Sequence, residues 1–140
     1  MSRVILDTGP LVALFNHRDA YHLWALEQIK QIEPPLITCE SVIVEASFLM
    51  AKMGTIQPQQ LFHYLDTGAL EIKFSLSDEY RSIRILLEKY ASVPMSVAGA
   101  CLVRMSEIWG HAHVFTLDSD FRIYRKNRNE IIPCIIPEQR

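Results

Sequence analysis

Short apolar runs alternate with longer helical patterns along the whole chain, and this alternation restricts the folds open to it. The runs that read as strands lie at 3–7, 36–38, 70–74, 114–117 and, interrupted by Pro133, 131–136. The segments between them carry apolar residues at helical spacing and lie at 8–16, 20–32, 40–53, 57–66, 78–90 and 96–109. Strands that alternate with helices pair in parallel and carry helices on both faces. The sequence therefore predicts an α/β fold, a three-layer α/β/α sandwich with a mostly parallel central sheet.

Length and composition indicate one domain in a reducing compartment. At 140 residues, without a Gly/Ser linker or an internal repeat, the chain is expected to form a single domain over residues 1–140. No stretch approaches the roughly 20 apolar residues of a membrane-spanning helix, and the N-terminus reaches Asp7 too early for a secretory signal peptide. Cys39, Cys101 and Cys134 lack CxxC spacing and indicate reduced core thiols. We therefore expect a cytoplasmic protein that does not bind membranes. Its formal net charge of −2 means that any contact with nucleic acid must be local.

Three acidic residues occupy positions that suit ligand binding. Asp7 ends the first predicted strand and Asp118 follows the strand at 114–117, and in parallel sheets ligands bind outside the carboxyl ends of the strands. For Asp7 and Asp118 the alternative is a structural role as a turn or capping aspartate. The expected cap of the first helix is Thr8. Glu45 lies among apolar residues and is expected in a largely buried helical stretch. An ionised carboxylate there must coordinate a cation or, as the alternative, pair with a Lys or Arg.

Taken together, these acids predict an acidic cluster at one edge of the sheet. Carboxylates that lie close together repel one another and raise each other's pKa unless a cation neutralises them. Ligand sets made only of oxygen favour hard cations such as Mg²⁺ or Mn²⁺. Such ions activate water and stabilise in-line displacement at a phosphodiester. The cluster is therefore a candidate metal site for phosphodiester hydrolysis.

Four stretches, at 4–14, 38–45, 93–100 and 115–121, carry a resemblance that spans nearly the whole chain. In them the sequence resembles the PIN-domain ribonucleases, and among these the VapC toxins of bacterial VapBC toxin–antitoxin modules. The resemblance implies a single PIN-like domain that acts as a Mg²⁺- or Mn²⁺-dependent endoribonuclease on RNA. It also implies a small protein antitoxin as partner and a homodimer as the usual form.

The resemblance also assigns roles to residues of this chain. It implies that Asp7, Glu45 and Asp118 are the catalytic residues and metal ligands. The residues expected to support this cluster through their polar groups are Thr116, Asp120 and Ser96.

Position 99 departs from the family's pattern. The family's motif reads Ala-Asp-Ala at the start of the central helix, whereas this chain reads Ala98-Gly99-Ala100. With Ser96 as N-cap, residue 99 is the third residue of the first turn, where an acid would complete a capping box and suit the helix dipole. A helical Gly instead costs roughly 1 kcal/mol relative to Ala. We interpret Gly99 as the place of a lost acid, and the alternative is that a small residue lets another backbone approach closely.

The departure at Gly99 opens a second functional hypothesis. A PIN-like domain that lacks one acidic ligand would bind antitoxin or RNA without cleaving it. Loss of one anionic ligand also predicts weak affinity for the cation. The two hypotheses, a nuclease and a catalytically inactive binding module, share the same fold and differ in cleavage.

Basic and apolar residues outside the acidic motifs suggest where partners bind. The basic run after the last acidic motif is expected either to hold an RNA backbone near the acids or to form a solvated helix face, and it consists of Arg122, Arg125, Lys126 and Arg128. The segment at 46–66 holds more apolar residues than one buried stripe requires, which predicts a dimer interface formed by Met50, Met53, Phe62, Tyr64 and Leu65. An antitoxin is expected to place an Arg or Lys in the acidic pocket.

Other signals in the sequence favour different classes of protein only weakly. Asp7-Thr8-Gly9 matches the signature of aspartic proteases, but those are β-rich and need a second such aspartate. A phosphatase of the haloacid-dehalogenase type would need an Asp where Gly9 stands. The five histidines show no metal-ligand spacing. Trp24 and Trp109 are expected to pack in the core or in a dimer interface rather than to stack on bases.

Overall fold

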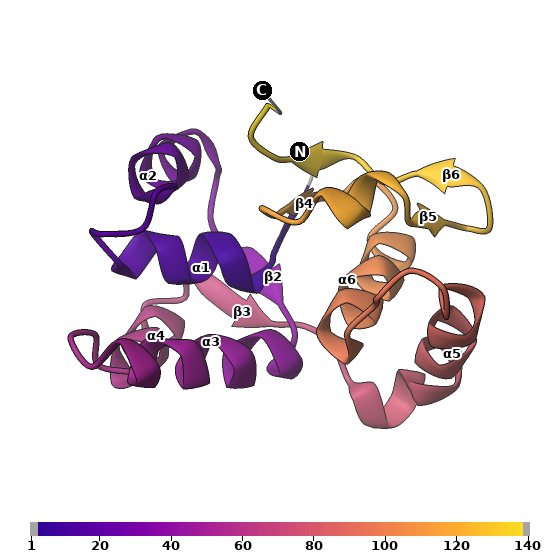
Figure 1. The fold of residues 1–140 in the computed structure, drawn as a ribbon, viewed down its shortest axis with the longest axis horizontal. Helices are drawn as coiled ribbons and strands as arrows, with labels where there is room; N and C mark the ends of the chain where they lie inside the picture. The colour runs from indigo at the N-terminus through magenta and orange to yellow at the C-terminus, as the bar shows by residue number, and fades with distance from the viewer. Residues whose placement is uncertain (1–2, 139–140) are drawn as a thin grey trace.

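The computed structural model describes residues 3–138, which form a parallel five-stranded sheet flanked by helices (Figure 1). In spatial order the sheet reads β3-β2-β1-β4-β7, with bounds β1 (Val4–Leu6), β2 (Leu36–Thr38), β3 (Leu70–Ile72), β4 (His113–Phe115) and β7 (Cys134–Ile135). The central strand β1 pairs with β2 and β4, so that Ile5 lies opposite Ile37 and Val114. Because each of these pairings is parallel, the carboxyl ends of the strands meet at one edge. The predicted parallel sheet is confirmed.

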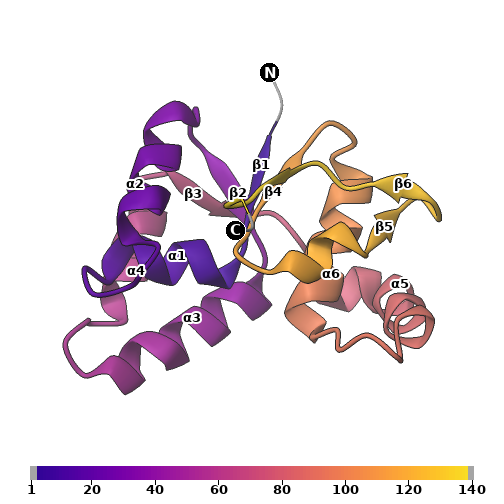
Figure 2. The same cartoon turned by 45° about the horizontal axis from the view of Figure 1, so that its top comes forward.

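Helices cover both faces of this sheet. They are α1 (Thr8–Phe15), α2 (His22–Gln31), α3 (Glu40–Met53), α4 (Gln59–Asp66), α5 (Leu76–Lys89), α6 (Val97–Ile108) and the 3₁₀ turn η1 (Ser119–Arg122). Figure 2 shows α1 to α4 on one side of the sheet and α5 and α6 on the other. The chain thus forms the predicted α/β/α sandwich. Across the described residues, every helix is too short or too polar to cross a bilayer.

The core lies between β1 and the two helix layers. All of β1 is buried, and α6 buries most of its side chains because its sequence is apolar nearly all round. Cys39 and Cys101 are buried free thiols and Cys134 is a partly buried one, as the cysteine spacing predicted. Trp24 and Trp109 both pack against this core, also as expected.

The C-terminal segment corrects one prediction. The expected edge strand at 131–136 is divided between two sheets, since β6 (Glu130–Ile131) pairs antiparallel with β5 (Arg125–Lys126) while β7 joins the main sheet. Pro133 lies between the two pieces and has no N–H to continue a ladder. The turn of the β5–β6 hairpin contains Asn127 and Arg128, whose φ angles are 47° and 78°.

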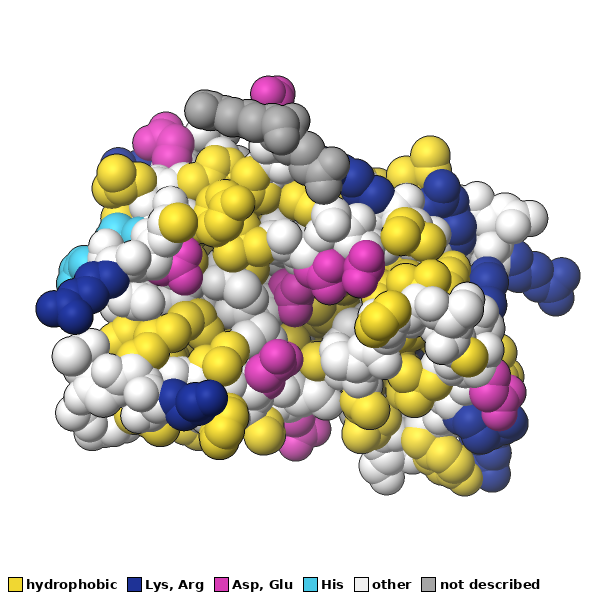
Figure 3. Space-filling model, viewed as in Figure 1, with side chains coloured by type: hydrophobic (Ala, Val, Ile, Leu, Met, Phe, Trp, Pro, Cys, Tyr) yellow, Lys and Arg dark blue, Asp and Glu magenta, His cyan; other side chains and the backbone are white. Residues whose placement is uncertain are grey.

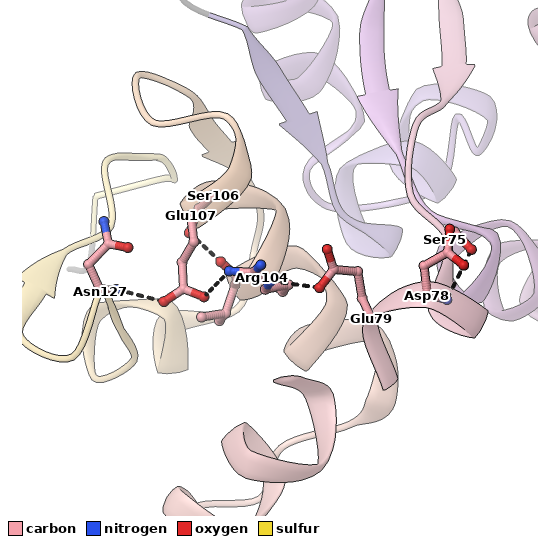
Figure 4. Close-up of polar contacts among 8 residues, drawn as sticks. Ser75, Asp78, Glu79, Arg104, Ser106, Glu107 and Asn127 are labelled. Atoms are coloured by element: carbon pink, nitrogen blue, oxygen red, sulfur yellow. Dashed lines mark hydrogen bonds and ion pairs between the residues drawn. The ribbon is translucent and has the colours of Figure 1, made fainter. Parts of the chain in front are cut away.

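A polar network attaches α5 and the β5–β6 hairpin to α6 (Figure 4). Arg104 on α6 donates from Nε to Glu79 of α5 at 3.0 Å and from Nη1 to Glu107 at 3.3 Å. Glu107 in turn accepts from the backbone N–H of Asn127 at 2.6 Å. The hairpin that carries part of the predicted basic run is therefore held against α6 by charged side chains.

Candidate functional site

A pocket of about 340 Å³ lies at the carboxyl ends of the central strands. Its walls come from the end of β1, α3, the start of α6 and the segment after β4, and are formed by Asp7, Thr8, Gly9, Glu45, Leu49, Ser96, Gly99, Leu117, Asp118 and Phe121. Figure 3 shows acidic side chains gathered in the middle of this face, with the visible Lys and Arg to either side. Residues that are widely separated in the sequence thus meet at one site, as the sheet topology requires. We refer to it below as the acidic pocket.

Asp7 is held by hydrogen bonds to both of its carboxylate oxygens. Its backbone N–H continues the sheet to Phe115 O at 2.9 Å, which fixes the residue just beyond β1. Oδ1 accepts from the N–H of Thr8 at 2.7 Å, and Oδ2 accepts from the hydroxyl of Thr116 at 2.6 Å. Asp7 itself therefore caps α1, which corrects the assignment of the cap to Thr8.

Thr116 connects the first and last acids of the pocket. Its side chain is fully buried, donates to Asp7 and accepts from the N–H of Asp118 at 2.9 Å. Asp118 Oδ1 then accepts from the N–H of Asp120 at 2.9 Å, which caps η1. Asp120 thus contacts Asp118 through its backbone, and its side chain does not line the acidic pocket.

Glu45 lies at the acidic pocket for a different reason than its sequence neighbours suggested. It is exposed on α3, as are Val44 at 69% and Phe48 at 62%, so the expectation of a largely buried helical stretch is wrong. Its Oε2 accepts from the hydroxyl of Thr8 at 3.1 Å. No Lys or Arg within residues 3–138 forms an ion pair with Glu45, so the salt-bridge alternative is not observed there. Thr8 is a site residue that the sequence analysis missed, and its position beside Asp7 is the signal that could have identified it.

Burial controls the ionisation of Asp7. Burial is the largest cause that raises the pKa of Asp7, to about 6, and the charges of Asp118 and Glu45 contribute to this rise. The hydrogen bonds from Thr116 and Thr8 oppose this rise, because they stabilise the ionised carboxylate. The acidic pocket therefore favours a proton on Asp7 in mildly acidic solution and a negative charge at neutral pH.

The ionisation of Asp7 leads to a prediction about stability. The folded chain holds the Asp7 proton more tightly than the unfolded chain, with a pKa of about 6 against 3.8, so stability falls as pH rises between these values. Asp7→Asn avoids this loss, and we expect a Tm on the order of 5 °C above that of the original chain at pH 7. The difference should shrink as pH falls through 6 toward 4.

Thermal unfolding in EDTA across this pH range measures the effect of Asp7→Asn. Asp66→Asn, at an exposed position outside the acidic pocket, is the matched control. A difference in Tm between Asp7→Asn and the original chain that stays constant from pH 4 to pH 8 would contradict the raised pKa of Asp7.

Gly99 leaves one wall of the acidic pocket open. Ser96 caps α6 as predicted, with Oγ accepting from the N–H of Gly99 at 2.9 Å. A Cβ on residue 99 would contact only this Ser96 Oγ, at 3.3 Å, so no neighbouring backbone explains the glycine. The alternative of close backbone approach is therefore wrong, and there is room for a side chain at position 99.

The side chains of the acidic pocket are of the type that binds a hard cation, but they are not spaced to hold one by themselves. Its charged donors are the carboxylate oxygens of Asp7, Glu45 and Asp118, which is the chemistry that Mg²⁺ prefers. Yet in the described part of the chain no three Asp, Glu, His or Cys side chains lie close enough together to hold one ion. Mg²⁺ commonly binds through one or two carboxylates, with waters and substrate phosphate as its other ligands, and the acidic pocket can supply the carboxylates.

The predicted basic run has several different surroundings. It lies on η1 and the hairpin, so the solvated helix face is not formed. Lys126 is buried and donates from Nζ to Gly110 O at 2.8 Å, which uses its ammonium group inside the fold. Arg125 donates to three backbone carbonyls of residues 122–124. Arg122 and Arg128 are exposed, and RNA binding by the run stays a prediction.

The apolar segment at 46–66 is only partly a surface. Met50 is fully buried and belongs to the core, which removes it from the predicted dimer interface. Met53 and Phe62 are 38% and 53% exposed, while Tyr64 and Leu65 are partly buried against the core. The homodimer itself stays a prediction.

Comparison with solved structures identifies a known architecture. No family model matches the chain, and no curated protein sequence matches it. Among solved structures, that of Mycobacterium tuberculosis VapC20, a sarcin–ricin loop cleaving toxin, matches with a TM-score of 0.74 and 17% sequence identity. The match covers 84% of this chain and 91% of that chain. This chain therefore has the fold of a VapC-type PIN domain, as its sequence motifs predicted.

Proposed function

We propose that this chain is a cytoplasmic endoribonuclease of the toxin–antitoxin type that uses Mg²⁺ or Mn²⁺ in the acidic pocket. The observation that carries the proposal is that Asp7, Glu45 and Asp118 line one pocket at the carboxyl edge of a PIN-fold sheet. VapC20, which shares the fold, is a toxin that cleaves the sarcin–ricin loop. This supports RNA as the class of substrate.

Hydrogen bonds from neighbouring polar groups fix the positions of the acids that would bind the cation. Asp7 and Asp118, connected through Thr116, would bind the ion together with Glu45. When bound, the ion activates water and stabilises the negative charge that develops on the phosphodiester. The hydroxyls of Thr116 and Thr8 orient Asp7 and Glu45, which limits the rearrangement that binding requires.

A second candidate function has its own support. Gly99 leaves an open wall at the start of α6, where the family's motif has an acid. A chain that lacks this charge would hold the cation weakly and could act by binding RNA or antitoxin without cleavage. The two candidates differ in whether product forms.

An RNA cleavage assay distinguishes them. The substrates are an end-labelled sarcin–ricin loop hairpin and an unstructured RNA, each incubated over a Mg²⁺ and a Mn²⁺ titration. For the nuclease we expect product only with metal, reduced on the order of a hundredfold or more in Asp7→Asn because the ion loses a buried anionic ligand. Asp66→Asn should cleave like the original chain. Product in EDTA would contradict the metal mechanism, and binding without product at any metal concentration would favour the inactive module.

The proposed antitoxin would act on the same pocket. We expect it to place an Arg or Lys between Asp7 and Asp118, because a cation there relieves carboxylate repulsion as the metal would. Asp7→Asn and Asp118→Asn should each weaken the complex by about tenfold, which titration calorimetry with the purified antitoxin measures. An antitoxin that binds both variants as tightly as the original chain would contradict this placement.

A further inference from the structure

A second, larger hollow adjoins the acidic pocket. Its volume is about 1120 Å³, and its walls include Tyr21, Trp24, Arg122 and Glu138. Leu117 lines both this hollow and the acidic pocket, since it lies between β4 and Asp118. A polymer whose phosphodiester reaches the acids across Leu117 would therefore place its next unit in the second hollow.

The size and lining of this hollow suit a segment of a polymer. Small-molecule pockets usually measure roughly 300–1,000 Å³ and are mostly apolar. This hollow is larger, and it combines aromatic rings with charged and hydroxyl groups. Such a combination of stacking surface and cationic donor is typical of sites for single-stranded nucleic acid.

Two aromatic rings form a supported wall of the hollow. Tyr21 is 44% exposed, and its ring lies 6.4 Å from that of Trp24 at an interplanar angle of 80°. Trp24 packs edge-on against the buried Phe115, with ring centroids 5.5 Å apart. The N–H of Tyr21 donates to Asp19 Oδ1 at 2.8 Å, which fixes the backbone before α2. The Tyr21 ring therefore offers an accessible surface whose position is set by the fold.

Charged groups of opposite sign lie in the same hollow. Arg122 is exposed, and within residues 3–138 its guanidinium makes one long hydrogen bond, from Nη2 to Pro137 O at 3.4 Å. Most of its donors are thus available to a phosphate. Glu138 repels phosphate, but its carboxylate accepts hydrogen bonds from an exocyclic amino group of a base. This charge pattern matches one nucleotide better than a bare anion.

We propose that the second hollow is the subsite for an unpaired nucleotide next to the phosphodiester that the acidic pocket holds. The base stacks on Tyr21 beside Trp24, and the phosphate of that nucleotide binds Arg122. This inference rests on the proposed RNA substrate and adds to it a site that would favour an unpaired nucleotide. It requires neither cleavage nor metal, so it is tested without them.

The test measures binding of a short fluorescein-labelled single-stranded RNA by anisotropy in EDTA. Stacking on an aromatic ring contributes enough that Tyr21→Ala should weaken binding about tenfold, while Tyr21→Phe should bind like the original chain. Arg122→Gln should weaken binding and reduce the slope of log affinity against log salt by about one. Matched controls are Tyr80→Ala and Arg81→Gln, which change exposed residues of α5 outside the hollow and should leave both quantities unchanged.

A fluorescence measurement keeps Tyr21 intact and reports on the hollow directly. Trp109→Phe leaves Trp24 as the single tryptophan, and it removes an indole N–H that is buried without a partner within the described chain. Addition of the same RNA without its fluorescein label should quench Trp24, and Arg122→Gln in this background should shift the titration to higher RNA concentration.

The outcomes separate this inference from the proposed function. Unchanged RNA affinity in Tyr21→Ala and Arg122→Gln, with cleavage still abolished by Asp7→Asn, would overturn the subsite and leave the nuclease standing. In that case a protein segment, rather than a nucleotide, would be the expected occupant of the second hollow. If the original chain neither binds nor cleaves RNA, both proposals fail together. Weakened binding in both variants without cleavage would support the subsite on an inactive module.

Discussion

Gly99→Asp is expected to strengthen binding of Mg²⁺ or Mn²⁺ and to raise RNA cleavage on the order of 10- to 100-fold. Loss of a group that supports a metal site commonly costs this much, and a direct anionic ligand contributes at least as much. Each carboxylate matters to Mg²⁺ because the ion keeps several of its waters and has few protein ligands. The measurement is titration calorimetry of both metals against both chains, followed by the RNA cleavage assay.

The structure permits this substitution at little cost to folding. Residue 99 is helical, and a Cβ there would approach only Ser96 Oγ, at 3.3 Å, a tight contact that is relieved when this hydroxyl moves by a few tenths of an ångström. An acid in the first turn of α6 also suits the helix dipole and completes the cap that begins with Ser96. These gains partly offset the repulsion that a fourth carboxylate adds in the metal-free pocket.

Two control variants separate charge from helix stability. Gly99→Asn fills the same space without the charge and should leave metal affinity low. Gly110→Asp makes the same exchange at an exposed glycine with open space around it, outside the acidic pocket, and should not change metal binding. If Gly99→Asp binds metal and cleaves RNA no better than the original chain, position 99 is not a ligand position and the motif assignment is wrong.

Thr116→Val is expected to lower metal affinity and cleavage by roughly ten- to a hundredfold. The Thr116 hydroxyl donates to Asp7 and accepts from the N–H of Asp118, and a hydrogen bond to a charged group contributes about 1.5–3 kcal/mol. Valine keeps the shape of the buried side chain and removes both contacts. Because the Thr116 hydrogen bond lowers the pKa of Asp7, its loss should raise that pKa above 6. The cation would then compete with a proton closer to neutral pH.

Carboxyl NMR titration of Asp7 and metal calorimetry measure these effects of Thr116→Val. Thr116→Ser retains the hydroxyl and should preserve most of the activity. Thr38→Val is the matched control, because Thr38 is also fully buried at a strand end but donates to Leu6 O at 2.8 Å rather than to an acid. It should lower stability without changing cleavage by the folded protein. Equal cleavage by Thr116→Val and Thr38→Val would show that the Thr116 bridge does not serve the acids.

Local sequence pattern determined the layers of this fold and the positions of two of its acids. Short apolar runs between amphipathic segments specify strands that must be covered on both faces, and the structure has that arrangement. Asp7 and Asp118 follow such runs directly, and parallel pairing brings the ends of the strands to one edge. The cap at Ser96 was likewise predictable, because it depends on residues within one turn.

Tertiary structure decided the features that depend on contacts between distant segments. The sequence neighbours of Glu45 are apolar, yet Glu45 and Phe48 are exposed on α3. Which face of a helix is buried depends on the elements that pack against it, and these are distant in sequence. Lys126 looked like a free cation in the sequence, but the hairpin folds it onto Gly110 O. Short strands such as β6 and β7 have too few residues to specify their own partners.

The ionisation of Asp7 and the space at Gly99 also depend on the assembled molecule. The pKa of Asp7 depends on burial, on the hydrogen bond from Thr116 and on two acids that are distant in sequence, so a local pattern does not determine it. The resemblance in sequence predicts an acid at position 99, where this chain has a glycine. Only the packed structure decided that a Cβ at position 99 would meet Ser96 Oγ and no atom of another element within 4 Å, because this depends on how separate elements pack around the acidic pocket.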